Sequence, residues 1–192
     1  MMKVVTYMGS PRKSGNTAAV LAWVEAELER LGHEVERVNI VDHEVRGCIG
    51  CYKCQDVPNE PGCVFKDEDD GDALWKKAIA SDLILLATPV YCWGFTAQLK
   101  AFIDRAFAMV KNYGPVEKKS LLDGRALALL TTGIGQVEGN ADLLKPVLDR
   151  FAGYTRMRVA GFLAIPGCSE PAALGDEERE AALRFARTIT TS

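Results

Sequence analysis

Five short apolar runs, separated by stretches with helical periodicity, constrain the fold of this chain more than any other feature. The runs occupy residues 3–8, 34–40, 82–88, 125–131 and 157–163. The first, third and fourth are nearly all apolar, which is typical of strands covered by helices on both faces. The second alternates polar and apolar side chains and is typical of an edge strand. Strands that alternate with helices predict a parallel, doubly wound α/β sheet.

The helical stretches carry apolar side chains every three or four residues. This spacing occurs around residues 20–31, 99–110, 144–151 and 182–189. Such stripes indicate helix faces that pack on the sheet. Pro146 lies in the third stretch, and because proline lacks an N–H it must sit in the first turn of that helix or kink it.

Five strands fit the flavodoxin-like order 2-1-3-4-5. In such sheets ligands bind beyond the carboxyl ends of the strands, at the point where the strand order reverses. The loops after Met8, Thr88 and Thr131 are therefore the ones expected to carry function. A long connection at about 42–70 shows no clear periodicity, and loops of this length are usually functional or disordered.

Length, charge and the chain start suggest a single cytoplasmic domain. The 192 residues suit one domain, predicted as 1–192 with a Cys-rich loop at about 42–70. The net charge is −3 and the Lys and Arg residues are scattered, so nucleic acid is not expected as a partner. No apolar run approaches the ~18 residues of a membrane span, and no signal peptide opens the sequence. We therefore expect no membrane partner and a cytoplasmic location.

The loop 9–17, between the first strand and the first helix, has the composition of an anion site. A phosphate here would meet the free N–H groups at the helix start, three hydroxyls, an amide and a guanidinium. The loop matches neither the Walker pattern nor the G-x-G-x-x-G pattern, which disfavours ATP and dinucleotides. The alternative is a plain βα turn in which Ser14 caps the helix. The candidate phosphate-binding residues are Ser10, Arg12, Ser14, Gly15, Asn16 and Thr17.

The loop after the third strand combines aromatic side chains with free backbone donors. Apolar side chains beyond a buried strand can cover a flat heterocycle, and N–H groups in the loop can donate to ring nitrogens and carbonyls. This combination suits the isoalloxazine ring of a flavin, and the alternative is an aromatic cluster that closes the core. The candidate residues are Pro89, Val90, Tyr91, Cys92, Trp93 and Gly94.

These two loops, together with the Leu-Lys-Ala-Phe-Ile-Asp-Arg segment at 99–105, resemble the NADPH-dependent FMN reductase family of flavodoxin-like proteins. The resemblance spans essentially the whole chain. It implies that the loop 9–17 holds the FMN phosphate and that the loop after the third strand contacts the flavin ring. It also implies that a third loop, with Thr132 and Gly133, closes over the ring and the ribityl side. Relatives of this type form homodimers or homotetramers, so the resemblance implies an oligomer.

Four cysteines are bunched in the long connection. Cys48, Cys51 and Cys54 have the C-x2-C-x2-C spacing of iron–sulfur ligands, and Cys63 is a candidate fourth ligand. This resembles the iron–sulfur flavoprotein branch of the same family, but the eight residues before Cys63 form a longer gap than is typical there. We favour a metal-free loop over a [4Fe–4S] cluster, with zinc as a third alternative.

An acidic run at 67–70 follows the cysteines. Acidic residues are favourable near the N-terminus of a helix because they oppose its dipole. We therefore expect a solvated helix start near Asp70 rather than a metal site.

The residues and the resemblance together favour an FMN-dependent NAD(P)H oxidoreductase. Electrons would pass from the nicotinamide to the flavin and then to a flavin, quinone or similar small-molecule acceptor, without a catalytic side chain. The alternative is an iron–sulfur flavoprotein that transfers electrons to a ferredoxin-like partner. A weaker third reading is a regulatory module with an empty flavin site. The acceptor, and the choice between NADH and NADPH, stay open at this level.

Overall fold

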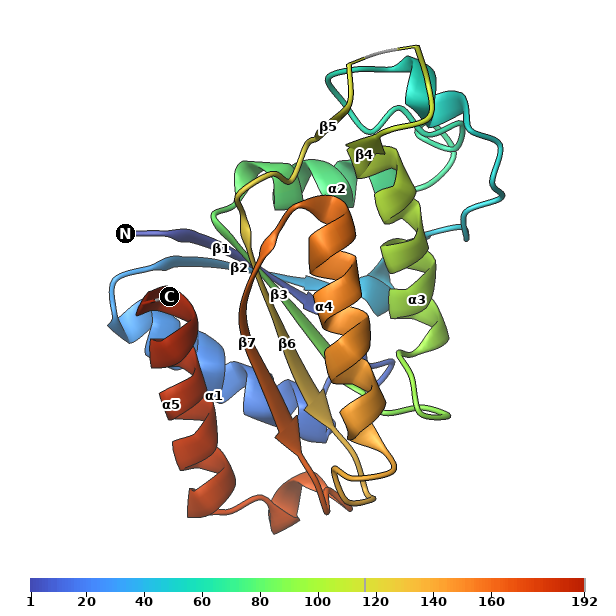
Figure 1. Cartoon of the computed structure of the whole chain (residues 1–192). Coiled ribbons are helices and arrows are strands. Elements are labelled where there is room, and N and C mark those ends of the chain that lie inside the picture. The colour runs from blue at the N-terminus through green and yellow to red at the C-terminus, as the bar shows by residue number, and fades with distance from the viewer. Residues whose placement is uncertain (116, 192) are drawn as a thin grey trace.

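A five-stranded parallel sheet forms the centre of the molecule (Figure 1). The computed structural model describes residues 1–115 and 117–191. The strand order is β2-β1-β3-β6-β7, and every neighbouring pair is parallel, which confirms the predicted flavodoxin-like order. The strands are β1 (Lys3–Met8), β2 (Glu34–Asn39), β3 (Leu83–Pro89), β6 (Ala126–Thr132) and β7 (Arg158–Ile165).

Helices cover both faces of the sheet. Helices α1 and α5 lie together on one face, and α2, α3 and α4 cover the other (Figure 1). Among the described residues, no helix has both the length and the apolar character needed to cross a bilayer. The α-helices are α1 (Asn16–Arg30), α2 (Gly71–Ala80), α3 (Ala97–Asp104), α4 (Leu144–Thr155) and α5 (Asp176–Thr191).

The central strands divide the core into two layers. In β3, Leu83 and Leu85 face the α1–α5 layer, whereas Ile84 and Leu86 face the α2–α4 layer. All four side chains are buried. Full burial of such a side chain contributes about 1.5–3 kcal/mol, so the apolar runs read from the sequence are the main source of sheet stability. Pro146 lies in the first turn of α4, where its missing N–H costs nothing.

Short elements complete the chain. A two-stranded antiparallel sheet, β4 (Val110–Lys111) with β5 (Lys119–Ser120), was not predicted. The long connection contains only the 3₁₀ helix η2 between residues 43 and 70, in line with its lack of periodicity. Figure 1 shows this connection beside β4 and β5, away from the carboxyl ends of β6 and β7. The 3₁₀ helices are η1 (Ile40–Asp42), η2 (Lys53–Asp56), η3 (Arg105–Met109), η4 (Ala141–Leu143) and η5 (Pro171–Ala173).

Candidate functional site

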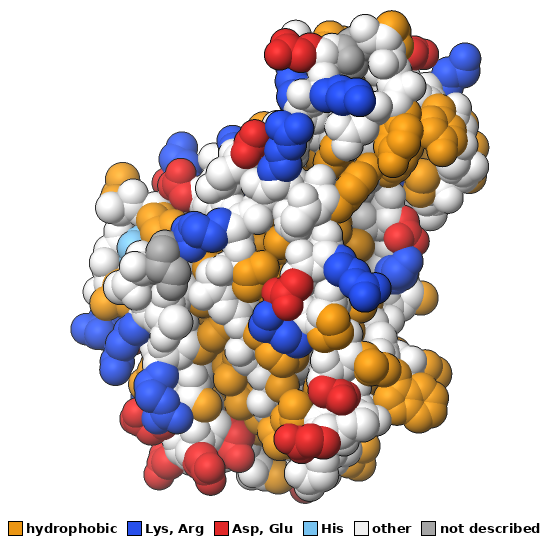
Figure 2. Space-filling view, viewed as in Figure 1, with side chains coloured by type: hydrophobic (Ala, Val, Ile, Leu, Met, Phe, Trp, Pro, Cys, Tyr) orange, Lys and Arg blue, Asp and Glu red, His pale blue; other side chains and the backbone are white. Residues whose placement is uncertain are grey.

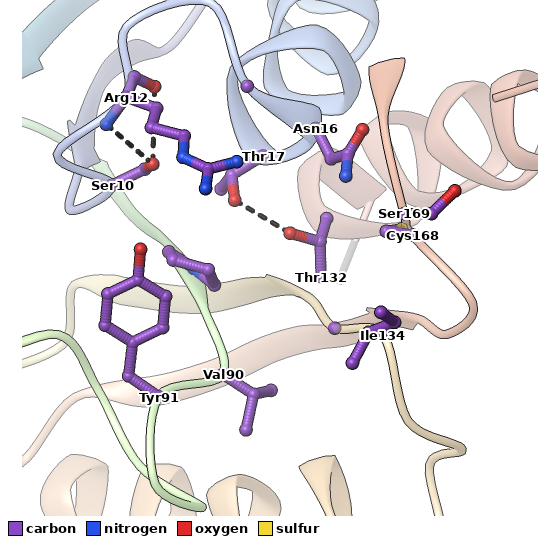
Figure 3. A pocket seen from close by; sticks show the side chains of 13 residues that line it. Ser10, Arg12, Asn16, Thr17, Val90, Tyr91, Thr132, Ile134, Cys168 and Ser169 are labelled. Atoms are coloured by element: carbon purple, nitrogen blue, oxygen red, sulfur yellow. Dashed lines mark hydrogen bonds between the residues drawn. The ribbon is translucent and has the colours of Figure 1, made fainter. Parts of the chain in front are cut away.

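A cavity of about 290 Å³ lies at the carboxyl ends of the sheet strands. Its volume is at the lower end of the range for ligand sites. Four loops line it, namely those that follow β1, β3, β6 and β7 (Figure 3). The lining residues are Ser10, Arg12, Gly15, Asn16, Thr17, Pro89, Val90, Tyr91, Thr132, Gly133, Ile134, Cys168 and Ser169.

The loop after β1 leads into α1 with its helix start uncapped. Gly15 is the N-cap, and no side chain accepts a hydrogen bond from the first turn. The N–H groups there remain free to bind an anion, and the helix dipole favours negative charge at this end. Ser10 Oγ accepts a hydrogen bond from the backbone N–H of Arg12 at 3.1 Å, which fixes the turn before the helix. The loop thus has the shape of an anion cradle.

Arg12 brings a positive charge to this cradle. Its side chain lines the cavity (Figure 3), and among the described residues it has no ion-pair partner. The neighbouring Lys13 is instead paired with Asp42 at the surface. Arg12 is therefore the cation of this loop that is free to bind a phosphate.

Two buried polar groups connect the phosphate loop to the rest of the cavity. Thr17 Oγ1 and Thr132 Oγ1 share a hydrogen bond of 2.7 Å, which joins the loop after β1 to the end of β6. Asn16 Oδ1 is buried and has no partner among the described residues. A buried acceptor without a donor is costly unless a ligand satisfies it, and a ligand hydroxyl has the right chemistry.

The loop after β3 contains a tight turn. Tyr91 N–H donates to Gly94 O at 3.0 Å and Gly94 N–H donates to Tyr91 O at 2.9 Å. The two central residues, Cys92 and Trp93, have φ values of 46° and 60°, in the left-handed region that favours glycine. Strain of this kind is concentrated at functional sites. Trp93 Nε1 also donates to Gly139 O at 3.1 Å, so the turn is tied to the loop after β6.

The ring-loop candidates divide between two hollows. Pro89, Val90 and Tyr91 line the 290 Å³ cavity. Cys92, Trp93 and Gly94 line an adjacent, larger groove of about 640 Å³ against α4, and Tyr91 belongs to both. Cys92 and Trp93 are exposed, so they do not form an aromatic cluster that closes the core.

The loop after β7 supplies residues that sequence reasoning missed. Gly133 N–H donates to Ile165 O at 3.0 Å, and Cys168 N–H donates to Gly133 O at 2.9 Å, so this loop is bound to the loop after β6. Cys168 is buried, and burial raises the pKa of its thiol. The rule that ligands bind at the carboxyl ends of strands applies equally to the fifth strand, and it was the available signal for Cys168 and Ser169. Ile134 was also missed, although it lies in the loop after β6, next to the predicted Thr132 and Gly133.

Most of the predicted cofactor residues thus converge on one cavity. The exception in the phosphate loop is Ser14, which is exposed, does not line the cavity and does not cap α1. The predicted residues at the cavity are Ser10, Arg12, Gly15, Asn16, Thr17, Pro89, Val90, Tyr91, Thr132 and Gly133.

The four clustered cysteines line a different, very small cavity. Cys48 and Cys51 are exposed, Cys54 is buried and Cys63 is half-buried. Burial raises the pKa of the Cys54 and Cys63 thiols. The cavity has a volume of about 20 Å³, which is the space of one water.

These thiols have the right chemistry for soft metals, but their arrangement does not fit a metal centre. Across residues 1–115 and 117–191, no three His, Cys, Asp or Glu side chains are grouped to hold a metal ion. The hollow between the thiols has room for about one water, so its walls would have to move apart to admit four irons and four sulfides. The thiols therefore match an iron–sulfur cluster in donor type but not in available room.

Contrary to the expectation from the sequence, the acidic run beside the cysteines is not fully exposed to solvent. The Asp69 side chain is 0% exposed and accepts a 2.7 Å hydrogen bond from Arg105, which is also buried. Arg105 also binds Asp72 at 3.1 Å. Burial alone would raise the pKa of Asp69, but its hydrogen bonds from Arg105 and two backbone N–H groups lower it. The predicted helix start near Asp70 is therefore confirmed, since Asp70 is the N-cap of α2. The expectation that this start is solvated is wrong for Asp69 and Asp72, because the buried Arg105 covers both carboxylates.

Comparison with known proteins decides the family. A family model described as NADPH-dependent FMN reductase matches residues 2–167. The chain belongs to this family. The prediction of an FMN-dependent oxidoreductase with a nicotinamide donor is thereby confirmed at the level of the family. The chemical groups around the cavity are suited to FMN. The uncapped helix start and the free guanidinium suit its phosphate, and the unpaired buried amide oxygen suits one of its hydroxyls.

Two kinds of protein are found among the relatives that this chain resembles. An iron–sulfur flavoprotein from Archaeoglobus fulgidus is 34% identical over 98% of this chain and 79% of its own length. An FMN-dependent NADH:quinone oxidoreductase from Thiobacillus denitrificans is 28% identical over 80% of this chain and 78% of its own. Among solved structures, the NAD(P)H:quinone oxidoreductase from Methanothermobacter marburgensis has a TM-score of 0.71 at 18% identity, and covers 99% of this chain and 98% of its own. The structural likeness shows the shared fold.

Proposed function

We propose that the protein holds FMN in the 290 Å³ cavity and passes electrons from NAD(P)H to a flavin, quinone or similar small acceptor. The observation that carries this proposal is the meeting of an anion cradle and an aromatic loop at one cavity. The cradle suits a terminal phosphate, and the aromatic loop suits a flat ring. A relative named as a NADH:quinone oxidoreductase supports the acceptor class.

The cavity residues act by binding and orienting the cofactor. The N–H groups at the start of α1, Ser10 and Arg12 would hold the phosphate. Asn16 Oδ1 would accept a hydrogen bond from a hydroxyl of the ribityl chain. Thr17 and Thr132, through their mutual hydrogen bond, keep the loops after β1 and β6 in register. Val90 and Tyr91 would border the ring.

The chemistry itself is left to the cofactor. The described residues that line the cavity include no His, Asp or Glu, the side chains that most often act as general acids or bases. When bound, FMN accepts a hydride equivalent from the nicotinamide and gives up the electrons to the second substrate. The chain's part is to orient the ring and to offer backbone donors from the loop after β3.

The test is spectroscopic. FMN would be added to purified protein from which any bound flavin has been removed, and excess cofactor is then removed under anaerobic conditions. The bound flavin is then mixed with NADH or NADPH. We expect stoichiometric FMN and rapid bleaching by at least one nicotinamide, followed by reoxidation with a quinone. A protein that takes up no FMN after reconstitution would refute the proposal.

We also propose a homodimer or homotetramer built from one domain that spans 1–192. Trp93, Leu143 and Val147 are exposed and line the 640 Å³ groove next to the ring loop. Figure 2 shows apolar side chains gathered at the lower right, where Figure 1 has the loop after β3. Apolar surface of this kind is typical of contacts with another chain. Light scattering coupled to size exclusion gives the mass, and a strict monomer at micromolar concentration contradicts the oligomer.

The second candidate is an electron carrier with an iron–sulfur cluster. The name of the Archaeoglobus fulgidus relative favours it, and so does the presence of four thiols on one cavity. The space available at that cavity weighs against it. Iron and sulfide assays on anaerobically purified protein separate the two candidates. The electron carrier should contain both elements, whereas the reductase should contain FMN without iron or sulfide.

A further inference from the structure

A fully buried lysine lies beneath the cysteine loop. Lys111, in β4, has no exposed surface. Its Nζ donates hydrogen bonds to three backbone carbonyls, those of Cys54 at 3.0 Å, Glu60 at 2.9 Å and Pro61 at 3.1 Å. All three protons of the ammonium group are therefore satisfied by one loop.

The three acceptors lie at the two ends of a single segment. Cys54 begins the eight-residue gap that separates the C-x2-C-x2-C motif from Cys63, and Glu60 and Pro61 are close to its end. By binding both ends, Lys111 folds this longer gap back on itself. Cys63 can then line the same small cavity as Cys54 in spite of the extra residues.

Burying this ammonium group is costly. Charges are rarely buried without an opposite charge, and in the described part of the chain Lys111 forms no ion pair with a carboxylate. Burial lowers its pKa. Because burial of the charge is unfavourable, the three hydrogen bonds that Lys111 donates must compensate for it, and all three go to the cysteine loop.

Gln55 fixes the same loop from its other side. Its Nε2 donates to Phe107 O and to Val110 O, both at 3.0 Å. Its Oε1 accepts from the N–H groups of Asn112 at 3.1 Å and Tyr113 at 3.2 Å. A buried side-chain amide with four backbone partners is fully satisfied, so the contact is rigid.

The end of the loop is anchored to α2. Cys63 N–H donates to Asp72 Oδ2 at 3.1 Å, and Asp72 is itself held by Arg105. These contacts come from protein groups alone. The backbone at Cys54 and at Cys63, the two less exposed cysteines, is thus held by hydrogen bonds to residues that lie farther along the chain.

We propose that Lys111 is a positioning residue that organises the cysteine cavity before any metal or cluster is present. In this protein the lysine cross-links the loop, a task that a cluster would otherwise perform through its ligands. The inference does not rest on the flavin function, because Lys111 is remote from the FMN cavity in its contacts.

The experiment compares Lys111→Met with Lys119→Met in metal-free protein treated with a chelator. Lys119 is the matched control, because it also reaches the loop, at Asn59 Oδ1, but through a single contact near the solvent. Hydrogen exchange is followed at the amides of Gln55 and Cys63. We expect these amides to be protected in the metal-free wild type and in Lys119→Met, and to exchange roughly tenfold faster or more in Lys111→Met.

A second readout follows the burial of Cys54. The rate of Cys54 alkylation by iodoacetamide is measured at one fixed pH by peptide mass spectrometry. Lys111→Met should raise this rate, because a loop without its three hydrogen bonds exposes the buried thiol, whereas Lys119→Met should leave the rate unchanged. FMN content should be the same in all three proteins.

The wild type alone can overturn the proposal. If its Gln55 and Cys63 amides exchange freely without metal, and gain protection only after reconstitution with iron and sulfide, then a cluster rather than Lys111 organises the loop. This comparison needs no variant, so it decides the question even where Lys111→Met is not obtained folded. Unaltered protection and an unaltered alkylation rate in a folded Lys111→Met would also overturn it.

Discussion

Thr17 and Thr132 are 115 positions apart in the chain, yet their hydroxyl oxygens lie 2.7 Å from each other at the floor of the cavity. Both side chains are buried. One is in the first turn of α1 and the other is the last residue of β6. Their hydrogen bond joins the loop proposed to hold the FMN phosphate to the loop proposed to close over the ring.

Breaking this contact should weaken both stability and FMN binding. Thr132→Val leaves the Thr17 hydroxyl without its partner, and we expect a loss of about 1–2 kcal/mol in the free energy of unfolding. FMN affinity should fall about tenfold because the phosphate loop is less well fixed. Urea denaturation and flavin fluorescence titration measure the two effects. In a double-mutant cycle with Thr17→Val, a coupling energy near zero would contradict the role of the pair.

Arg12 should discriminate FMN from riboflavin. Arg12→Gln removes the free guanidinium of the cradle, so FMN affinity should fall about tenfold while riboflavin affinity stays the same. Lys13→Gln is the matched control, since Lys13 is already paired with Asp42. Binding is measured by titration at low and high salt. Equal losses for both flavins in Arg12→Gln would mean that the residue does not bind the phosphate.

The buried pair of Arg105 and Asp69 should be important for stability. Arg105→Met leaves the carboxylates of Asp69 and Asp72 buried and uncompensated, which we expect to cost about 3–5 kcal/mol. Lys100→Met breaks an exposed pair with Asp104 and should cost less than about 1 kcal/mol. Chemical denaturation compares the two. Similar small losses would show that Asp69 is readily solvated.

Glu27 should make the packing of α1 against α5 sensitive to acid. Hydrogen bonds from Arg30 and then Arg187 lower the pKa of Glu27 from 4.5 to about 2. A carboxyl whose pKa is lower in the folded protein stabilises it above the unfolded pKa, and this stability is lost as the pH falls toward the folded value. The urea midpoint should therefore decrease between about pH 5 and pH 2. Glu27→Gln should lower the midpoint at pH 6 and flatten this part of the profile, and an unchanged slope would exclude Glu27 as the cause.

The sheet and its helices could be predicted from the sequence because their signal is local. Leu83 to Ala87 are all buried, and a continuous apolar run predicts such burial on both faces of a strand without knowledge of the rest of the fold. Pro146 could be placed in a first turn by the same logic, since the constraint lies in its own ring. The strand order also followed, because right-handed connections leave few arrangements for five parallel strands.

Part of the candidate site could be predicted for a related reason. Loops that follow parallel strands must meet at one edge of the sheet, so Ser10, Tyr91 and Thr132 were expected to lie together, and all three line the cavity. The division of the ring loop between two hollows could not be predicted. It depends on the left-handed conformations of Cys92 and Trp93, which neither residue type favours.

By itself the sequence determined which segments are strands and helices, which family the chain resembles and which loops meet at the cavity. Only the tertiary structure decided which charged and sulfur-containing side chains are buried and which groups they contact. Arg105 covers Asp69 from 36 positions away, and Lys111 binds the cysteine loop from 57 positions beyond Cys54. Burial and hydrogen bonding of such groups depend on neighbours that are distant in the chain, and no local periodicity reports them.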